Sequence, residues 1–334
     1  MSVYPSDSKA LGVLLGCQRK LRAFLTVSEQ CCLSRVSWWL YHSAGAQTTA
    51  HGQLRTADEE VQRLHARLTR GGRSRTKVKL SVAQVRVLLN DLQLVATGIR
   101  PSCLVDCCAL TKEQVTLLLD FESHWTHIRA VMLEGDVFFV NVEAFIREKM
   151  TFGLYYQMYV DVSANLATPQ LLSDVTRLQT LSTWTITTCK SLLSAPQVLK
   201  LKRPPLLNAT ALAGILLCYP CTYDILVDTE GATDDWSEQE NCLAMCPLYL
   251  LQTVAIRSQL ELPLQDFSVP QNLLHKRRCF NDGEAAHDID SLPLLNHLRT
   301  LCRLQVQKAI DRSSLDDIQV QVRVSCRTLP RVAL

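Results

Sequence analysis

Glycine is scarce in this sequence, and the motifs that depend on it are missing. Only 12 of the 334 residues are glycine. They form no G-x-x-x-x-G-K-[ST], G-x-G-x-x-G or G-x-S-x-G pattern, and H-E-x-x-H is also missing. These patterns build phosphate-binding loops, the turn that presents a nucleophilic serine, and a zinc-binding helix face. Their absence argues against P-loop ATPases, standard dinucleotide dehydrogenases, elbow-type serine hydrolases and zincins.

Long apolar runs and a strong charge of one sign are missing too. No run reaches the ~18 apolar residues of a membrane-spanning helix, since Gly214, Pro247 and Gln252 interrupt the longest candidates. The short apolar run Ala10–Cys17 has its basic residues after it instead of before it, which is the wrong order for a signal peptide. A formal net charge of +3 is too weak to indicate nucleic acid or an anionic membrane as partner.

Cysteine, by contrast, is plentiful, with 14 residues. Without a secretory signal, this number indicates a reducing compartment and free thiols that mostly pack as small apolar side chains. We therefore expect a soluble cytoplasmic protein. Residues 1–57 contain six Lys or Arg and two acidic residues, with many serines. This composition leaves a mitochondrial presequence open as the alternative.

Hydrophobic periodicity predicts an α/β fold. Ser81 begins one predicted helix, and Thr111 with Gln114 forms a capping box for another. Apolar runs predict buried strands, and their order along the chain suggests a mixed, partly parallel sheet flanked by helices, with antiparallel strands in the C-terminal half. The predicted strands are Cys103–Ala109, Val137–Asn141, Leu154–Asp161, Cys221–Val227, Cys246–Ile256, Leu262–Val269 and Ile318–Val324. Further helices are predicted to begin at Thr168-Pro169 and to span Leu206–Leu217 and Leu292–Ile310. We expect residues 57–334 to form a single domain after a poorly specified segment, residues 1–56.

Four blocks resemble a known family: "GIRPSCLVDCC", "VFFVNVEAF", "NCLAMCPLYLLQTVAI" and "FSVP". They are similar to the vertebrate uncharacterised family named for open reading frame seventy-four of human chromosome one. The likeness covers roughly residues 80–270. It implies a soluble protein of unknown function and carries no catalytic residue over to this chain.

Three predicted strands end in a polar residue, at Asp106, Asn141 and Asp161. If these strands are parallel, the three side chains share the edge where ligand crevices of open α/β sheets form. Two carboxylates and an amide there could bind Mg²⁺ or act in acid–base catalysis. The alternative is that Asp and Asn simply favour the turns after strands.

The stretch "CYPC" contains two of the four cysteines in a C-x2-C-x20-C-x3-C pattern: Cys218, Cys221, Cys242 and Cys246. This spacing is close to that of a zinc ribbon. A redox dithiol is disfavoured, because Cys218 follows a predicted helix, and a helix C-terminus opposes the thiolate. The remaining possibility is that Pro220 ends the helix and the thiols pack in the core.

Two further motifs, one with histidines and one with basic residues, are weaker indications of a metal site or a nucleic-acid surface. His124 and His127, near Glu122, lack further metal ligands at a known spacing, and "HKRRC" (His275–Cys279) lacks the aromatic residues of a nucleic-acid surface. With no catalytic motif established, we expect a non-catalytic interaction or scaffold protein. Its contact surface would be the acidic segment Asp228–Glu240 or the basic segment Arg63–Lys79. The alternative is an enzyme at the strand ends.

Overall fold

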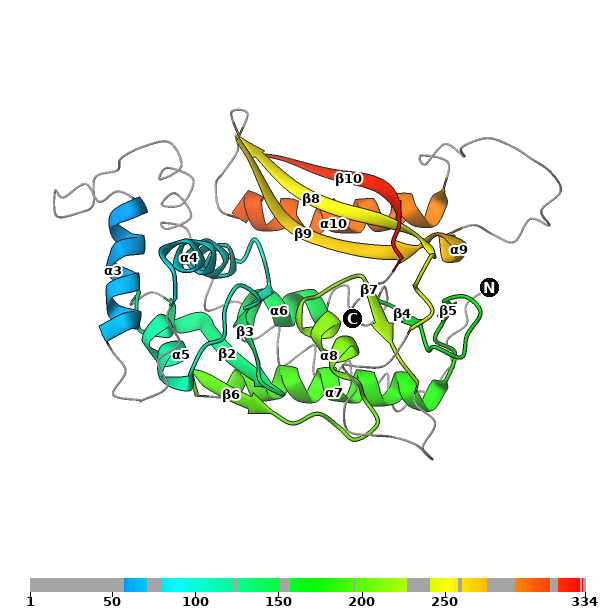
Figure 1. Ribbon diagram of the computed structural model, residues 1–334, viewed down its shortest axis with the longest axis horizontal. Helices are drawn as coiled ribbons and strands as arrows, with labels where there is room; N and C mark the ends of the chain where they lie inside the picture. Colours follow the sequence, from blue (N-terminus) through cyan, green and yellow to red (C-terminus); the bar gives the residue numbers. More distant parts are fainter. Residues whose placement is uncertain are drawn as a thin grey trace.

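The computed structural model describes residues 57–70, 80–122, 125–150, 157–194, 196–226, 241–257, 260–274, 292–312, 318–330 and 332. Its strands form three sheets, and helices pack around them (Figure 1). One sheet is wholly antiparallel and lies in the C-terminal part of the chain, while the other two are mixed. The predicted α/β class, with its mixed sheet and its antiparallel C-terminal strands, is confirmed.

The first sheet has the strand order β1-β3-β2-β6. Its strands are β1 (Ser102–Leu104), β2 (Ile128–Leu133), β3 (Asp136–Asn141) and β6 (Val198–Leu201). Only β2 and β6 are parallel. Glu134 and Gly135 join β2 to β3 in a two-residue turn, and both have positive φ, as the tightest hairpin turns require.

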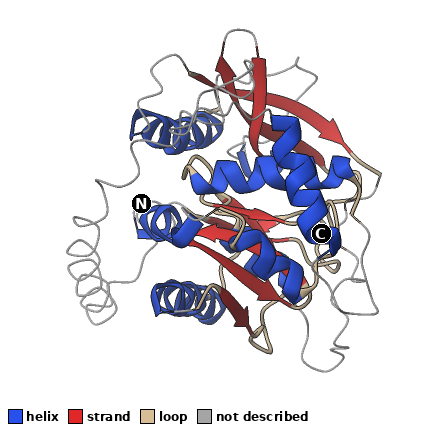
Figure 2. Cartoon of the chain, turned by 90° about the vertical axis from the view of Figure 1, so that its left-hand side faces the viewer, coloured by secondary structure: helices blue, strands red, loops and turns tan. Residues whose placement is uncertain are grey.

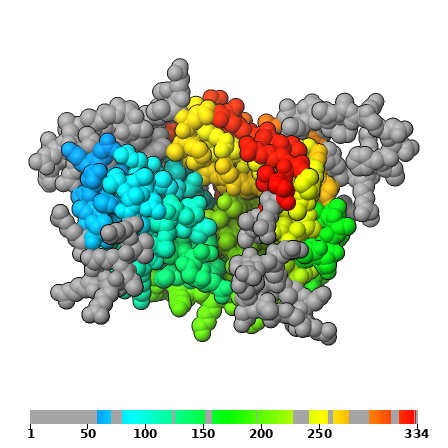
Figure 3. Space-filling model, in the orientation of Figure 1, coloured from blue at the N-terminus to red at the C-terminus, as the bar shows by residue number. Residues whose placement is uncertain are grey.

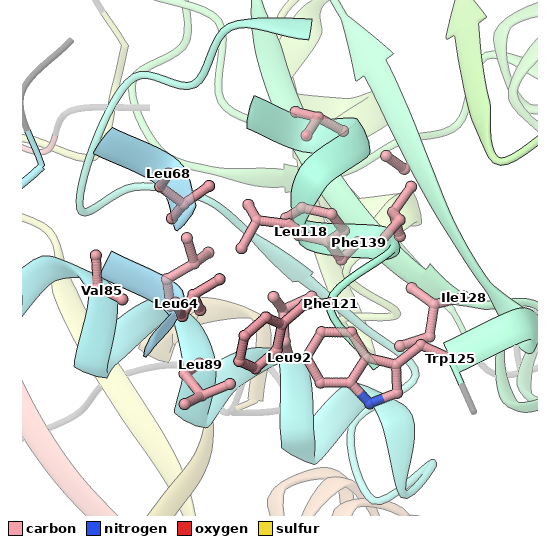
Figure 4. Packing of buried hydrophobic residues seen from close by; sticks show 14 of the residues in the cluster. Leu64, Leu68, Val85, Leu89, Leu92, Leu118, Phe121, Trp125, Ile128 and Phe139 are labelled. Carbon is pink, nitrogen blue, oxygen red and sulfur yellow. The ribbon is translucent and has the colours of Figure 1, made fainter. Parts of the chain in front are cut away.

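Helices cover both faces of this sheet. Phe138 and Phe139 are neighbours in β3 and belong to different core clusters, because successive side chains of a strand point to opposite faces. One cluster joins the sheet to α3 (Ala57–Arg70), α4 (Val82–Ala96) and α5 (Lys112–Leu119), as Figure 4 shows for Leu64, Leu92 and Leu118. The other joins it to α6 (Val142–Glu148), α7 (Val175–Ser194) and α8 (Ala209–Leu216). The helices around the sheet are also visible in Figure 2.

The two other sheets have three strands each. In the order β5-β4-β7, β4 (Met158–Asp161) lies between β5 (Gln170–Leu171) and β7 (Cys221–Asp224), and β4 and β7 are parallel. In the order β10-β8-β9, β8 (Pro247–Arg257) pairs with β9 (Leu260–Pro270) and with β10 (Gln319–Thr328). Helix α10 (Pro293–Arg312) lies behind this third sheet (Figure 1), and α9 (Gln271–Leu274) follows β9. A short 3-10 turn, η1 (Trp125–His127), precedes β2.

The expected parallel arrangement of the strands near positions 103, 137 and 154 is wrong. Strand β1 runs antiparallel to β3, and β4 belongs to the second sheet. The physical reason is the β2–β3 hairpin, which places β2 in the sheet beside β3 and reverses the chain within two residues. Strand β2 was not predicted from the sequence, and neither was its parallel neighbour β6.

Smaller differences concern the ends of elements. The strand expected over Cys103–Ala109 is confined to Ser102–Leu104. The helix expected from Thr168-Pro169 begins at Val175, because Gln170 and Leu171 pair with β4 instead. Residues 1–56 lie outside the described residues, so the predicted single domain over 57–334 stays a prediction. No helix within the described ranges combines the length and hydrophobicity needed to cross a bilayer.

Candidate functional site

Asn141, one of the three candidate catalytic residues, has a structural role. It is the N-cap of α6, where its Oδ1 accepts a hydrogen bond from the Ala144 amide at 3.0 Å. Its Nδ2 donates to the Val95 carbonyl at the end of α4, at 2.9 Å. The side chain is buried, and its oxygen and nitrogen are both engaged by backbone groups. Asn141 therefore fixes the junction between β3, α4 and α6.

Asp161 is also engaged locally. Its Oδ1 accepts hydrogen bonds from the Ser163 amide at 2.9 Å and from the Ser163 hydroxyl at 2.5 Å. The Ser163 hydroxyl in turn accepts from the Leu226 amide. This is the turn chemistry that favours Asp after a strand. The topology therefore does not bring Asp161 together with Asn141, which belongs to the first sheet.

Asp106 lies in a different setting, at the wall of a cleft of about 260 Å³. The cleft is formed where the end of α4, β1, the end of α8, β9 and α10 meet, and Figure 3 shows the surface hollowed where these segments adjoin. Asp106 has no hydrogen-bond or ion-pair partner among the described residues. Of the three predicted residues, it is the one that lines a cavity.

Arg100 is held rigidly in this cleft. Its Nη1 donates to Asp91 Oδ1 at 2.6 Å, and its Nε donates to the carbonyl of Leu264 in β9 at 2.7 Å. Leu264 sits at a register shift between β8 and β9, where Thr253 faces Gln265 and Val254 faces Pro263. The extra residue of such a bulge turns its carbonyl out of the regular ladder. Arg100 therefore fastens the first sheet to the third across the cleft.

Aromatic and apolar groups form the other walls. Tyr219 lines the cleft and stacks on Phe267, with ring centroids 6.1 Å apart. Gln305 of α10 also lines it, and its buried Nε2 has no hydrogen-bond partner among the described residues. A buried donor without an acceptor is costly. An acceptor group of a ligand at this wall would satisfy it.

The electrostatics of the cleft are dominated by carboxylates. Asp91, Asp106 and Asp266 line the cleft together with one guanidinium, that of Arg100, so three carboxylates and one cation give these groups a formal net charge of −2. Burial raises the pKa of Asp91 above its ordinary value, although the adjacent Arg100 opposes this shift. Burial raises the pKa of Cys103 to about 12, with Asp91 adding to the effect, so this thiol is neutral and not a nucleophile. The cleft therefore favours a cation.

The comparison with known proteins identifies a family. A family model described as "Domain of unknown function (DUF4504)" matches residues 70–282, which is more than half of the chain. The chain belongs to this family. The matched region of the DUF4504 family includes Asp91, Arg100, Asp106 and Asp266, and it ends before α10. No curated protein and no solved structure gives a significant match.

The "CYPC" stretch within the family region is a helix terminus. Cys218 has a φ of 57°, the left-handed conformation that follows many helices. Its amide donates to the Ile215 carbonyl at 3.1 Å, and the Tyr219 amide donates to the Gly214 carbonyl at 3.0 Å. These two bonds form a Schellman motif, which satisfies the last carbonyls of α8. Pro220 then prevents the helix from continuing.

The four cysteines of the zinc-like pattern are divided between two core clusters. Cys218 packs in the cluster of α6, α7 and α8, while Cys221 packs in the cluster of the second and third sheets, with Cys242 and Cys246 partly buried against it. The described residues contain no group of three or more His, Cys, Asp or Glu side chains that could hold a metal ion. Burial raises the pKa of Cys218 to about 12 and that of Cys242 to about 11. The spacing is therefore not accompanied by a zinc-ribbon geometry.

A buried ion pair was missed from the sequence. Asp224, at the end of β7, accepts two hydrogen bonds from Arg177 of α7, Nε to Oδ2 at 2.7 Å and Nη2 to Oδ1 at 2.8 Å. Asn208, the N-cap of α8, donates its Nδ2 to Asp224 Oδ1 at 2.6 Å. The only sequence signals were an arginine inside an apolar helix pattern and an aspartate inside an apolar strand. Because every group has its partner, we interpret this network as structural.

The remaining sequence candidates have no defined site. The Nε2 of His127 lies 2.9 Å from the Ala96 carbonyl, whereas His124 lies outside the described residues. The "HKRRC" motif and the acidic segment Asp228–Glu240 also lie outside them, as does the second half of Arg63–Lys79. In the described half of that segment, Arg63 contacts Glu122 at 2.7 Å and lies over the Phe121 ring.

Proposed function

We propose that this chain is a non-catalytic binding protein and that the Arg100 cleft holds a small ligand with ammonium groups. The observation that carries the proposal is the charge of the cleft, which is lined by three aspartates and one arginine. A ligand carrying two positive charges would balance it. The cleft also lies where separate parts of the fold meet, which is a common place for ligand sites.

The individual groups support a ligand of this kind. Asp106 has no partner among the described residues and is exposed, so it is available to accept from an ammonium group. The ring of Tyr219 lines the same cavity and can lie against a cation. The buried Nε2 of Gln305 calls for a hydrogen-bond acceptor on the same ligand. A compact polar molecule with amino groups and one acceptor meets all three requirements.

A non-catalytic role is favoured over an enzyme for two reasons. The polar atoms of Asn141 and Asp161 are engaged in hydrogen bonds with backbone amides, a carbonyl and a neighbouring serine. Arg100 is tied to Asp91 and to the Leu264 carbonyl, so the charged centre of the cleft is fixed in place. Such a cleft can select a ligand by charge without moving a proton.

Thermal unfolding of the full chain with a simple diamine tests this proposal. We expect 1,4-diaminobutane to raise Tm, and 1,4-butanediol, which has the same carbon chain and no charge, to leave it unchanged. At a hundredfold excess over Kd, binding contributes about 2.7 kcal/mol, which corresponds to a shift of a few degrees.

Two variants provide the matched comparison. Asp106→Asn removes one charge from the cleft and is expected to weaken diamine binding at least tenfold. Asp136→Asn removes an exposed carboxylate at the β2–β3 turn and is expected to change nothing. Equal binding by both variants, or equal shifts with the diol, would contradict a diamine site.

An acid–base or magnesium-dependent enzyme is the second candidate. The raised pKa of Asp91 favours it, because general acids and bases often have pKa values shifted by burial. In such an enzyme, Asp91 and Asp106 would together supply the acid–base groups or the magnesium ligands. An Asp91→Asn variant that keeps ligand binding but loses turnover of the bound compound would support the enzyme over the binding protein.

The broader assignments follow from the sequence. The high content of cysteine supports a cytoplasmic location, where thiols stay reduced. A protein partner on Asp228–Glu240 or on Arg63–Lys79 remains part of the proposal, as a second contact apart from the cleft. Within the DUF4504 family, the blocks around Gly98 and Asn241 support placement in the group named for open reading frame seventy-four of human chromosome one.

A further inference from the structure

The two edges of the third sheet differ in how they are protected. The order β10-β8-β9 leaves one side of β10 and one side of β9 without a strand partner among the described residues. An unpaired edge exposes a row of backbone amides and carbonyls, and proteins usually block it with proline, a bulge or a covering segment. The comparison of β9 with β10 therefore shows where the sheet can accept another strand.

Strand β9 is blocked in all three ways. Pro263 and Pro270 lack amide hydrogens. The register against β8 shifts at Thr253 and Val254, and the carbonyl of Leu264 accepts from Arg100. The hydroxyls of Ser268 and of Tyr223 in β7 lie 2.8 Å apart. No further strand can align along this edge.

Strand β10 has none of these features. It pairs with β8 over ten residues, from Gln319↔Ile256 to Thr328↔Pro247, with no register shift. It contains neither proline nor glycine, and its polar side chains are exposed. Figure 1 shows β10 at the outer margin of the sheet, and Figure 3 shows its red atoms at the surface. Within the described part of the chain, the outer side of the β10 backbone therefore has no strand partner.

A basic groove runs beside the first half of β10. It has a volume of about 480 Å³ and lies between α10 and the start of the strand. Arg299 and Arg303 stand one helical turn apart on α10 and both line it, whereas no acidic residue among those that the structure describes does. Arg327 lies farther along the exposed strand. Neither Arg303 nor Arg327 has an ion-pair partner in the part of the chain that the structure describes.

We propose that the outer edge of β10 binds an extended, acidic segment of a partner protein as an added strand of the third sheet. Backbone hydrogen bonds to β10 would supply affinity. Carboxylates on one face of the segment would meet Arg299 and Arg303, which suit bidentate contact with carboxylates. The basic lining selects an acidic partner over a second copy of this chain, whose β10 would bring Arg327 to the same edge, whereas Arg323 is paired with Glu261. This surface is separate from the cleft, so the result of a test of one proposal does not decide the other.

Fluorescence anisotropy with the full chain and a labelled peptide tests the proposal. The probe is a ten-residue peptide of alternating Glu and Val, and the charge control replaces each Glu by Lys. We expect the acidic peptide to bind and the basic one not to bind. Arg303→Glu should weaken binding at least tenfold, whereas Lys112→Glu, a charge reversal at the exposed start of α5, should not. Arg303 is exposed, so the melting temperature of its variant should match that of the wild type.

Backbone methylation of the probe separates strand addition from simple charge attraction. Two further acidic peptides carry N-methyl groups on alternate residues, one on the odd and one on the even positions. An added strand bonds to β10 through amides of one parity only, so one peptide should lose binding and the other should keep it. Equal binding by both, binding of the basic peptide, or no binding of the acidic probe would overturn the proposal. So would sedimentation showing a dimer that Arg303→Glu dissociates, since a second copy would then occupy the edge.

Discussion

Arginine pairs with aspartate in two places that have opposite surroundings. Arg177 and Asp224 are 9% and 0% exposed, and Asn208 completes their network. Arg100 and Asp91 are 23% and 25% exposed, and two further aspartates share their cleft. In the first place every charge is matched and water is excluded. In the second place negative charge exceeds positive charge, and a cavity lies next to it.

The difference teaches how to separate structural from functional charge in this fold. A buried, saturated pair has no capacity left for a ligand, and it fixes the geometry of the elements that carry it. A partly exposed pair in a cleft contributes little to stability. Its free capacity can then be used for binding. Four substitutions test this division, in order of decreasing effect.

The largest effect is expected for Asp224→Ala. This change leaves the Arg177 guanidinium buried without its bidentate partner, which should lower the free energy of unfolding by about 3–5 kcal/mol. Urea denaturation measures it. The control is the double variant Arg177→Leu, Asp224→Leu, which should lose less than the single variant because no charge stays buried. A single variant that loses under 1 kcal/mol would place this pair in the same class as Arg100–Asp91.

Glu148 tests the boundary between the two classes. Burial raises the pKa of Glu148 to about 7, although Lys149, Arg147 and Lys308 oppose the shift. Between pH 4.5 and 7 the folded protein therefore holds more protons than the unfolded chain, so stability falls as pH rises through this window. Glu148→Gln should remove that fall, which amounts to about 3 kcal/mol for a rise of this size. Urea titrations at pH 4.5 and pH 8 measure it, with Glu143→Gln on the same helix as the control. Parallel pH profiles for Glu148→Gln and the wild type would refute the buried setting of this carboxyl.

A smaller loss is expected for Asn208→Ala. Asn208 Oδ1 caps α8 by accepting from the Ala211 amide at 2.7 Å, and its Nδ2 donates to Asp224. Loss of both should cost about 2 kcal/mol in chemical denaturation. Asn208→Ser keeps a cap oxygen and loses the amide donor, so it should recover about half of the loss. Equal losses for the serine and alanine variants would assign the whole effect to the Asp224 contact.

The smallest effect is expected for Asp91→Asn. The pair with Arg100 is partly exposed, so the change in stability at pH 7 should stay within about 1 kcal/mol. Because burial raises the pKa of Asp91, the wild type should lose stability relative to the variant as pH rises above about 4. Urea unfolding at pH 4 and pH 7 measures the difference. A loss as large as that for Asp224→Ala would erase the distinction between the two pairs.

Local chemistry made the helix starts predictable. Ser81 caps α4 and Thr111 with Gln114 forms the capping box of α5, as the sequence indicated, and the structure adds a second capping box between Ser81 and Gln84. The strands at Val137 and at Cys246–Ile256, together with the C-terminal helix, were also found from periodicity. These features depend on neighbours three or four residues apart, so the sequence contains the information directly.

The candidate site was predictable only in part. Asp106 was chosen because it follows an apolar run, and it does line the cleft. The expectation that pointed to Asp106 was wrong, because it assumed that the strands near positions 103 and 137 are parallel, whereas β1 and β3 are antiparallel. The other cleft residues gave no signal, because Arg100 and Gln305 are 205 positions apart in the chain and meet only after the third sheet has packed on the first.

The sequence by itself determined the α/β class, the helix caps at Ser81 and Thr111 and the antiparallel C-terminal strands. Only the tertiary structure decided which polar side chains are already engaged by other parts of the chain and which can still bind a ligand. Hydrogen bonds and ion pairs between distant segments engage Asn141 and Asp224 completely and leave Asp106 open. The physical reason is that the free capacity of a polar group depends on every partner around it in space, and pairing over long distances in the chain leaves no periodic trace in the sequence.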